Sequence, residues 1–151
     1  MGTMKGFFQP KNPKKYGGSK KIVYRSSYEL KYMLHLDNDP DTILWFSEEI
    51  SIPYESPKDK RIHLYYPDFV VKKKVGEKVK TYMIEIKPAV QAKKPTLTNQ
   101  NGKTKKTKTR LTESITYHVN QAKWASARAF CKDKNWEFAV LTEAELGIKT
   151  R

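Results

Sequence analysis

Two runs of strand-forming residues, 61–73 and 79–87, restrict the fold more than any other feature of the chain, because they read as one hairpin. The turn between them falls at Gly76-Glu77. Glycine at the first central position suits a two-residue type II′ turn. We therefore expect an antiparallel pair of strands in which directly opposed residues have numbers that sum to 153.

This register places two carboxylates side by side. Asp68 lies opposite Glu85, with Cβ atoms about 5 Å apart, and Lys87 projects from the same face two residues further on. Like charges directly opposed destabilise a sheet, and a cation between them is the usual remedy. Two hard oxygen ligands with open positions favour Mg²⁺, or Mn²⁺ as a substitute, over zinc.

The same three residues indicate a chemistry. A metal held by Asp68 and Glu85 would polarise a phosphate and lower the pKa of a bound water. Lys87 would orient that water or stabilise charge in the transition state. The pattern predicts metal-assisted phosphodiester hydrolysis. The alternative is an exposed cross-strand pair of carboxylates with a lysine nearby by chance, because the register is inferred from the turn alone.

The net charge of +14 is concentrated in two segments. Residues 1–25 and 88–110 each carry seven Lys and Arg and no acid, while the rest of the chain balances. Such segments suit phosphate contacts, although lysine tracts also serve solubility alone. We expect double-stranded DNA as the partner. The predicted DNA contacts in these segments are Lys14, Lys15, Arg25, Lys93, Lys94, Lys105, Lys106 and Lys108.

Two segments are predicted to lack regular structure. Residues 1–21 are rich in Pro, Gly and Lys and read as a basic arm, part of which could dock on the body or stack on bases through Phe7, Phe8 and Tyr16. Residues 88–110 show no periodicity and read as a mobile loop inserted into a single domain, 22–151.

The remaining elements predict an α/β fold. Helices are expected from Ser26 to about Asp37, where Ser26 is the N-cap and Glu29 completes a capping box, and over 112–134. Strands are expected over 43–52 and 136–141, with a short helix opening at Thr142. The expected buried positions of the two long helices are Leu30, Met33 and Leu34, then Ile115, Val119, Ala122, Ala125, Ala129 and Phe130. The order predicts a mixed sheet of about four strands flanked by helices.

Composition excludes some protein classes. No apolar run approaches the roughly 18–20 residues of a membrane span, so no membrane partner is expected. The basic N-terminus lacks the apolar segment of a secretory signal. Cys131 is the single cysteine and reads as a small buried residue of a protein from a reducing compartment.

The local sequence around the two carboxylates resembles a known signature. Tyr65-Tyr66-Pro67-Asp68-Phe69-Val70, followed by Ile84-Glu85-Ile86-Lys87, resembles the PD-(D/E)xK nuclease motif and implies a restriction-endonuclease-like core. In that superfamily a Glu on the preceding helix often completes the metal site, which implies that role for Glu29; its capping role is the alternative. The resemblance also implies phosphate-binding residues on the second long helix, here Lys123 and Arg128. The alternative is that this side of the helix is simply exposed to solvent.

The wider pattern is similar to two narrower families. The segments 8–16, 24–26, 45–50, 52–54 and 66–69 resemble the head-completion nucleases of T-even-type tailed phages. The segments 120–124 and 138–143 are similar to TnsA-type transposon-end nucleases. The first resemblance implies a virion protein of the head or neck, also present in the host cytoplasm, that acts on packaged DNA beside portal or neck proteins before the tail joins. A non-catalytic DNA-binding assembly protein and a nuclease for branched DNA are the alternatives.

Overall fold

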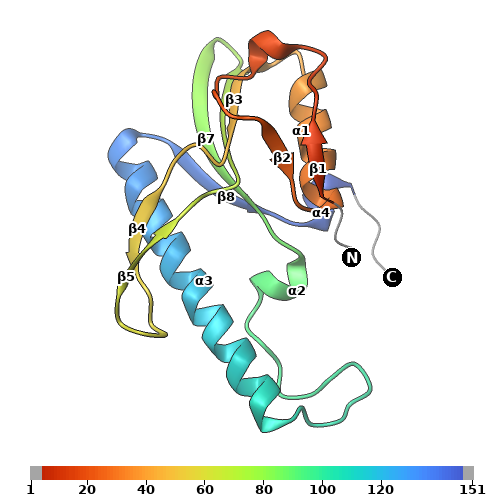
Figure 1. Cartoon of the computed structure of the whole chain (residues 1–151), viewed down its shortest axis with the longest axis vertical. Coiled ribbons are helices and arrows are strands. Elements are labelled where there is room, and N and C mark those ends of the chain that lie inside the picture. Colours follow the sequence, from red (N-terminus) through yellow and green to blue (C-terminus); the bar gives the residue numbers. More distant parts are fainter. Residues whose placement is uncertain (1–4, 148–151) are drawn as a thin grey trace.

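A four-stranded mixed sheet forms the centre of the molecule, which the computed structural model describes for residues 5–147 (Figure 1). In sheet order its strands are β3 (Thr42–Ser47), β6 (Phe69–Val75), β7 (Lys78–Ile86) and β8 (Glu137–Leu141). Only β7 and β8 are parallel, and the long helix between them provides the crossover that a parallel pair needs. The predicted α/β class with a four-stranded mixed sheet is confirmed.

The β6–β7 hairpin has the predicted turn and register. Gly76 has a φ of +64° while Glu77 keeps a negative φ, as a type II′ turn requires. The pairs run from Val75–Lys78 to Phe69–Ile84, and their numbers sum to 153. The residues just beyond the last pair, Asp68 and Glu85, are therefore opposed as expected.

Two predicted strands are each divided in the structure. The run 61–73 separates into β5 (Ile62–Tyr65) and β6, because Pro67 has no amide proton to continue a ladder. The run 43–52 ends early, at Ser47, because Glu48 has a φ of +53° that extended backbone cannot accommodate. A separate strand, β4 (Ile52–Glu55), contains Pro53 and pairs with β5 as a two-stranded ribbon.

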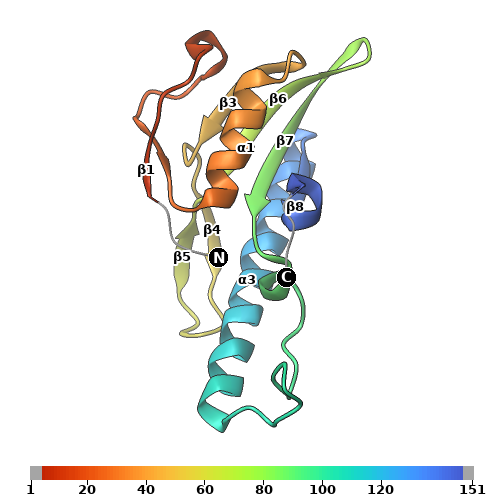
Figure 2. The ribbon, with the colours of Figure 1, turned by 90° about the vertical axis from the view of Figure 1, so that its right-hand side faces the viewer.

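Helices cover both faces of the sheet (Figure 2). Helix α1 (Ser27–Asn38) buries Met33 against Trp45 and Phe69 of the strands. Helix α3 (Thr107–Lys134) and the β4–β5 ribbon pack on the other face, around Met83 and Trp124. The site described below lies on this second face, where residue 68 continues β6 and residue 85 lies near the end of β7.

The prediction of the buried helix sides is confirmed only in part: Met33 is buried, and four other predicted residues pack partly buried against the two cores, namely Leu30, Val119, Ala122 and Phe130. Leu34 is 46% exposed, and α1 instead buries Tyr28, Tyr32 and Leu36 beside Met33. In α3, Ala125 and Ala129 are exposed. The buried residues of α3 are Asn120, Trp124, Ala127 and Cys131. Small alanines tolerate either environment, so the large Trp124 sets the phase of the helix. Cys131 is buried, as expected.

The described part of the N-terminal segment, residues 5–21, is folded onto the body, so the prediction of an arm without regular structure is wrong there; residues 1–4 lie outside the described residues. Strand β1 (Gly6–Phe8) pairs with β2 (Ile22–Tyr24), and a 3-10 turn, η1 (Pro13–Lys15), lies between them. Phe8 is buried edge-on against Trp45, with ring centroids 5.9 Å apart. Aromatic packing therefore outweighs the Pro and Gly content of this segment.

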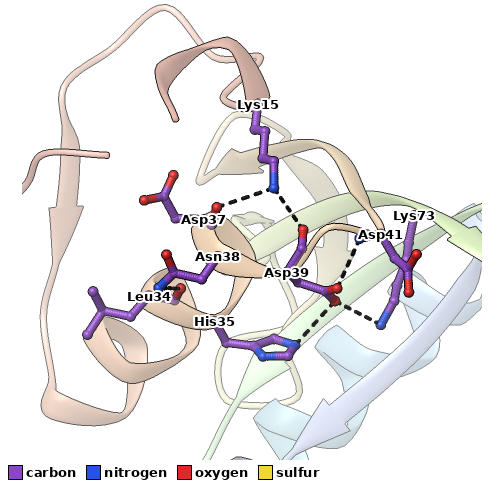
Figure 3. Close-up of polar contacts among 8 residues, drawn as sticks. All are labelled: Lys15, Leu34, His35, Asp37, Asn38, Asp39, Asp41 and Lys73. Carbon is purple, nitrogen blue, oxygen red and sulfur yellow. Dashed lines mark hydrogen bonds and ion pairs between the residues drawn. The ribbon is translucent and has the colours of Figure 1, made fainter. Parts of the chain in front are cut away.

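A buried aspartate fixes the same segment to the end of α1. Asp37, 1% exposed, accepts hydrogen bonds from the backbone amides of Lys11 at 2.8 Å and Asn12 at 3.0 Å. The Lys15 ammonium donates to the carbonyl oxygens of Asp37 and Asp39, at 3.3 and 2.8 Å (Figure 3). A lysine at this position satisfies carbonyls that the helix leaves unpaired.

The predicted loop 88–110 is partly ordered. It contains the single turn α2 (Ala89–Ala92) and a bridge between Thr98 and Thr104, and α3 already begins at Thr107. The N-terminal half of α3 and this loop extend away from the sheet (Figures 1 and 2). The short last helix is confirmed as α4 (Glu143–Leu146), with a capping box formed by Thr142 and Glu145. No helix within residues 5–147 is long and apolar enough to cross a membrane.

Candidate active site

Two carboxylates meet where the β6–β7 ladder ends. Asp68 follows the fully buried Pro67, and its Oδ2 accepts a hydrogen bond of 2.7 Å from the backbone amide of Ile86. Its own carbonyl oxygen accepts from the amide of Glu48 at 3.1 Å. Backbone contacts on both sides therefore hold Asp68 next to Glu85.

The pair is electrostatically strained. Burial raises the pKa of Asp68 well above its ordinary value, and the charges of Glu85 and then Glu29 raise it further. The Asp68 and Glu85 side chains are close enough to share a hydrogen bond when one of them is protonated. No ion pair to either carboxylate is present in the described part of the chain. Two carboxylates at this distance repel each other, and a bound cation would reduce that repulsion.

Glu85 is held by two neutral donors. The residue Glu85 is only 6% exposed to solvent. The Tyr65 hydroxyl donates to Oε1 at 2.9 Å, and the Trp124 indole nitrogen donates to Oε2 at 3.4 Å. Burial, followed by the Glu85 charge, raises the pKa of Tyr65 far above its ordinary value, so this hydroxyl remains a donor.

Glu29 lies in the first turn of α1 and acts on the pair through its charge. The predicted N-cap is confirmed, since the Ser26 hydroxyl accepts from the Glu29 amide at 3.1 Å. The Glu29 carboxylate accepts from the same hydroxyl at 3.3 Å and not from the Ser26 backbone amide, so only the N-cap half of the predicted capping box is formed. Burial raises the pKa of Glu29. Between residues 5 and 147 no group of three or more His, Cys, Asp or Glu side chains could hold a metal ion, so Glu29 does not form such a group with Asp68 and Glu85.

Lys87 follows the last residue of β7 and is half-buried. Its backbone amide donates to the Leu141 carbonyl at 2.9 Å, which continues the parallel pairing with β8 for one residue. The extended geometry of β7 therefore continues to Lys87. Lys87 lies two positions after Glu85, and residues two positions apart in a strand share one face of the sheet.

Arg25 and Glu48 form an ion pair beside the carboxylates. Arg25 Nε lies 3.1 Å from Glu48 Oε1, and a second contact of 3.4 Å makes the pair bidentate. This hydrogen bond raises the pKa of Arg25, with smaller effects from the charges of Glu29 and Asp68. The neighbouring Glu49 instead accepts a hydrogen bond of 3.1 Å from the backbone amide of Ser19.

Lys123 lies against the site. Its ammonium stands over the rings of Tyr54 and Tyr65, at 5.9 and 5.8 Å from their centroids. Lys123 therefore contacts the tyrosine that binds Glu85, whereas Arg128 stacks over Phe138 further along α3.

The residues predicted to contact DNA fall into two groups. Lys15 binds carbonyls at the end of α1, Lys105 pairs with Glu113 at 3.0 Å with its side chain only 16% exposed, and Arg25 pairs with Glu48, so these three are already engaged within the protein. Five others are exposed, and none forms an ion pair within the described part of the chain: Lys14, Lys93, Lys94, Lys106 and Lys108.

Sequence reasoning missed Tyr65 and Trp124 as partners of Glu85. Both lie inside segments that resemble nuclease families, but their contacts join residues 20 and 39 positions apart. One local signal was available: Tyr65 precedes Asp68 by three residues, and an aromatic residue with a polar tip is suited to a buried carboxylate.

The side chains fit a divalent cation of the magnesium type. Asp68 and Glu85 present oxygen ligands only, and their mutual repulsion is not neutralised by a protein cation among the described residues. Mg²⁺ commonly binds through one or two carboxylates and keeps several waters, so a third protein carboxylate is not required.

The fold is that of a nuclease of the PD-(D/E)xK type, and comparison with known proteins identifies the branch. Residues 39–143 match the family described as TnsA-like endonuclease N terminal, and the chain belongs to this family. The chain is also 34% identical over 139 residues to the head completion nuclease of Enterobacteria phage T4, an alignment that covers 91% of this chain and 90% of that protein. Both comparisons support a nuclease role.

Proposed function

We propose that this chain is a Mg²⁺-dependent DNA endonuclease, for which Mn²⁺ can substitute, that acts on packaged phage DNA during head completion. The observation that carries the proposal is the close approach of Asp68 and Glu85 at the end of the β6–β7 hairpin. The name of the T4 relative supports the biological setting. The corresponding locations are the virion head or neck and the host cytoplasm, with portal or neck proteins as partners.

The residues have distinct roles in this proposal. Asp68 and Glu85 would hold the metal, and Glu29 adds negative charge beside them. When bound, the metal would polarise the scissile phosphate and lower the pKa of a bound water. Lys87 would orient the attacking water and stabilise the negative charge that develops on the phosphate oxygens. The water oxygen forms a bond to phosphorus and gives up a proton to solvent, the bond to one sugar oxygen breaks, and that oxygen leaves and takes up a proton from solvent.

The basic surface would bring the substrate to these residues. Lys93, Lys94 and Lys106 are exposed on the loop, and Lys108 is exposed in the first turn of α3; both parts extend from the body (Figure 1). Lysines on such a segment bind phosphates without reading base sequence, and they release counterions from duplex DNA when they do so. Double-stranded DNA of any sequence is therefore the proposed substrate class.

A plasmid assay tests the proposal. Supercoiled and linear duplexes are incubated with the purified chain in Mg²⁺, in Mn²⁺ or in EDTA, and nicking is expected only with a metal. Asp68→Asn should abolish it, whereas the control Asp59→Asn, which alters an exposed carboxylate in the β4–β5 turn, should not. DNA retention without cleavage under any metal would favour a non-catalytic assembly protein. Preferential cleavage of branched substrates would favour a structure-specific nuclease.

A further inference from the structure

The carboxylate of Glu85 is oriented by side chains from two other elements of the fold. Tyr65 comes from β5, and Trp124 from the middle of α3. We propose that Tyr65 and Trp124 are positioning residues that hold Glu85 in the orientation of a metal ligand, an inference that rests on the proposed function. Neither residue is proposed to touch the metal or the DNA.

The contacts define both oxygens of the carboxylate. Tyr65 binds Oε1 and Trp124 binds Oε2, so rotation of the carboxylate plane would break at least one hydrogen bond. Each carboxylate oxygen has two lone pairs, and one neutral donor occupies only one of them. The remaining acceptor capacity is left for Asp68 and for a cation beside it.

The neutrality of the donors favours a metal over a salt bridge. An Arg or Lys partner would cancel the Glu85 charge and compete with a divalent cation for it. A hydroxyl and an indole fix the direction of the carboxylate without placing a positive charge beside it. Because an unneutralised buried carboxylate is costly, its retention opposite Asp68 is more consistent with a ligand than with a core residue.

Both donors are themselves fixed by packing. Trp124 is 3% exposed and Tyr65 is 5% exposed, in one apolar cluster with Met83 and Tyr54. Lys123, next to Trp124 in the chain, stands over the Tyr65 ring. The position of Glu85 is therefore coupled to the docking of α3 on the β4–β5 ribbon.

The test measures metal affinity without DNA. Isothermal titration calorimetry with Mn²⁺ alone is carried out on the full chain, on Tyr65→Phe and on Trp124→Phe. We expect the dissociation constant to rise about tenfold or more in each, since loss of a group that orients a ligand typically costs 10–100-fold in affinity. In DNA cleavage, the loss at limiting Mn²⁺ should be partly restored at saturating Mn²⁺, with the KM for DNA unchanged.

Matched controls separate positioning from folding. Tyr54→Phe removes a hydroxyl from the same cluster, and Trp136→Phe changes another indole packed near α3. Neither residue hydrogen-bonds Glu85 in the described part of the chain, so both variants should bind Mn²⁺ like the unmodified chain. Melting curves in EDTA show whether each variant is folded, and Trp124→Phe provides the test if Tyr65→Phe does not fold.

The outcomes distinguish this inference from the proposed function. If Asp68→Asn weakens Mn²⁺ binding while Tyr65→Phe and Trp124→Phe bind as tightly as their controls, the positioning role is wrong and the metal site stands. If the unmodified chain binds no Mn²⁺, or Asp68→Asn binds it equally well, the metal site is wrong and the positioning role is overturned with it.

Discussion

The backbone amide of Ile86 donates a 2.7 Å hydrogen bond to the carboxylate of Asp68. The last backbone pair of the β6–β7 ladder is Phe69–Ile84. Beyond it, the Asp68 side chain takes the place of a backbone carbonyl of β6 as the acceptor for the Ile86 amide. This contact ties a residue outside the regular strand to the strand that carries Glu85. The two carboxylates are therefore placed by the hairpin itself rather than by a loop.

This contact predicts a difference between two substitutions of Asp68. Asp68→Asn keeps an oxygen that can accept from Ile86, whereas Asp68→Ala leaves a buried amide without a partner, which costs about 1–3 kcal/mol. Both remove the same charge, so the repulsion from Glu85 is relieved equally. We expect Asp68→Ala to have the lower free energy of unfolding in urea with EDTA present. Equal stability would mean that the Ile86 contact contributes nothing.

The raised pKa of Asp68 predicts a pH dependence of stability. Because its pKa is higher in the folded chain than in the unfolded chain, the folded state binds more protons between the two values. The free energy of unfolding should therefore fall as pH rises from about 4, the ordinary aspartate range, through the raised pKa. Melting temperatures measured in EDTA should show this decline for the unmodified chain and a weaker one for Asp68→Asn. Parallel profiles for the two proteins would contradict the assignment.

The sequence predicted this part of the fold because the signals were local. The turn at Gly76-Glu77 sets the register, and the register sets the opposition of Asp68 and Glu85. The N-cap at Ser26 and the start of the short helix at Thr142 likewise depend on signals contained within four residues.

What could not be predicted depends on contacts between distant segments. Asp37 looked like a helix end, yet it is buried because it accepts amides 25 and 26 residues away. Lys105 looked like a free cation, but the early start of α3 brings it to Glu113. The periodicity of apolar side chains carries no information about such partners. It therefore could not predict the packed N-terminal segment or the Tyr65–Glu85–Trp124 contacts.

Lys87 should be needed for cleavage but not for metal binding. Its proposed role is to act on the water and on the charge that develops in the transition state, and removal of one such group typically lowers kcat by about 100–1,000-fold. Lys87→Ala should therefore cleave DNA at least about 100-fold more slowly while binding Mn²⁺ normally. Lys78→Ala, an exposed lysine at the other end of β7, serves as the control. Weakened Mn²⁺ binding in Lys87→Ala would assign Lys87 to the metal site instead.

The exposed lysines of the loop and of the first turn of α3 should determine the salt dependence of DNA binding. Deletion of the whole loop would also remove α2, the Lys105–Glu113 ion pair and the first residues of α3, so point substitutions are the sharper test. The test variant changes four exposed residues to glutamine: Lys93, Lys94, Lys106 and Lys108. For each phosphate that the variant no longer neutralises, the slope of log affinity against log salt should become shallower by about 0.9.

A matched variant with the same reduction of charge decides whether position matters. Its four exposed lysines lie on the hairpin, in the β4–β5 turn and at the end of α3, and are also changed to glutamine: Lys58, Lys72, Lys78 and Lys132. If the loop contacts DNA directly, only the first variant should flatten the slope in fluorescence anisotropy titrations from low to high salt. Equal flattening in both variants would mean that net charge alone attracts DNA. An unchanged slope in the first variant would remove the loop from the DNA-binding surface.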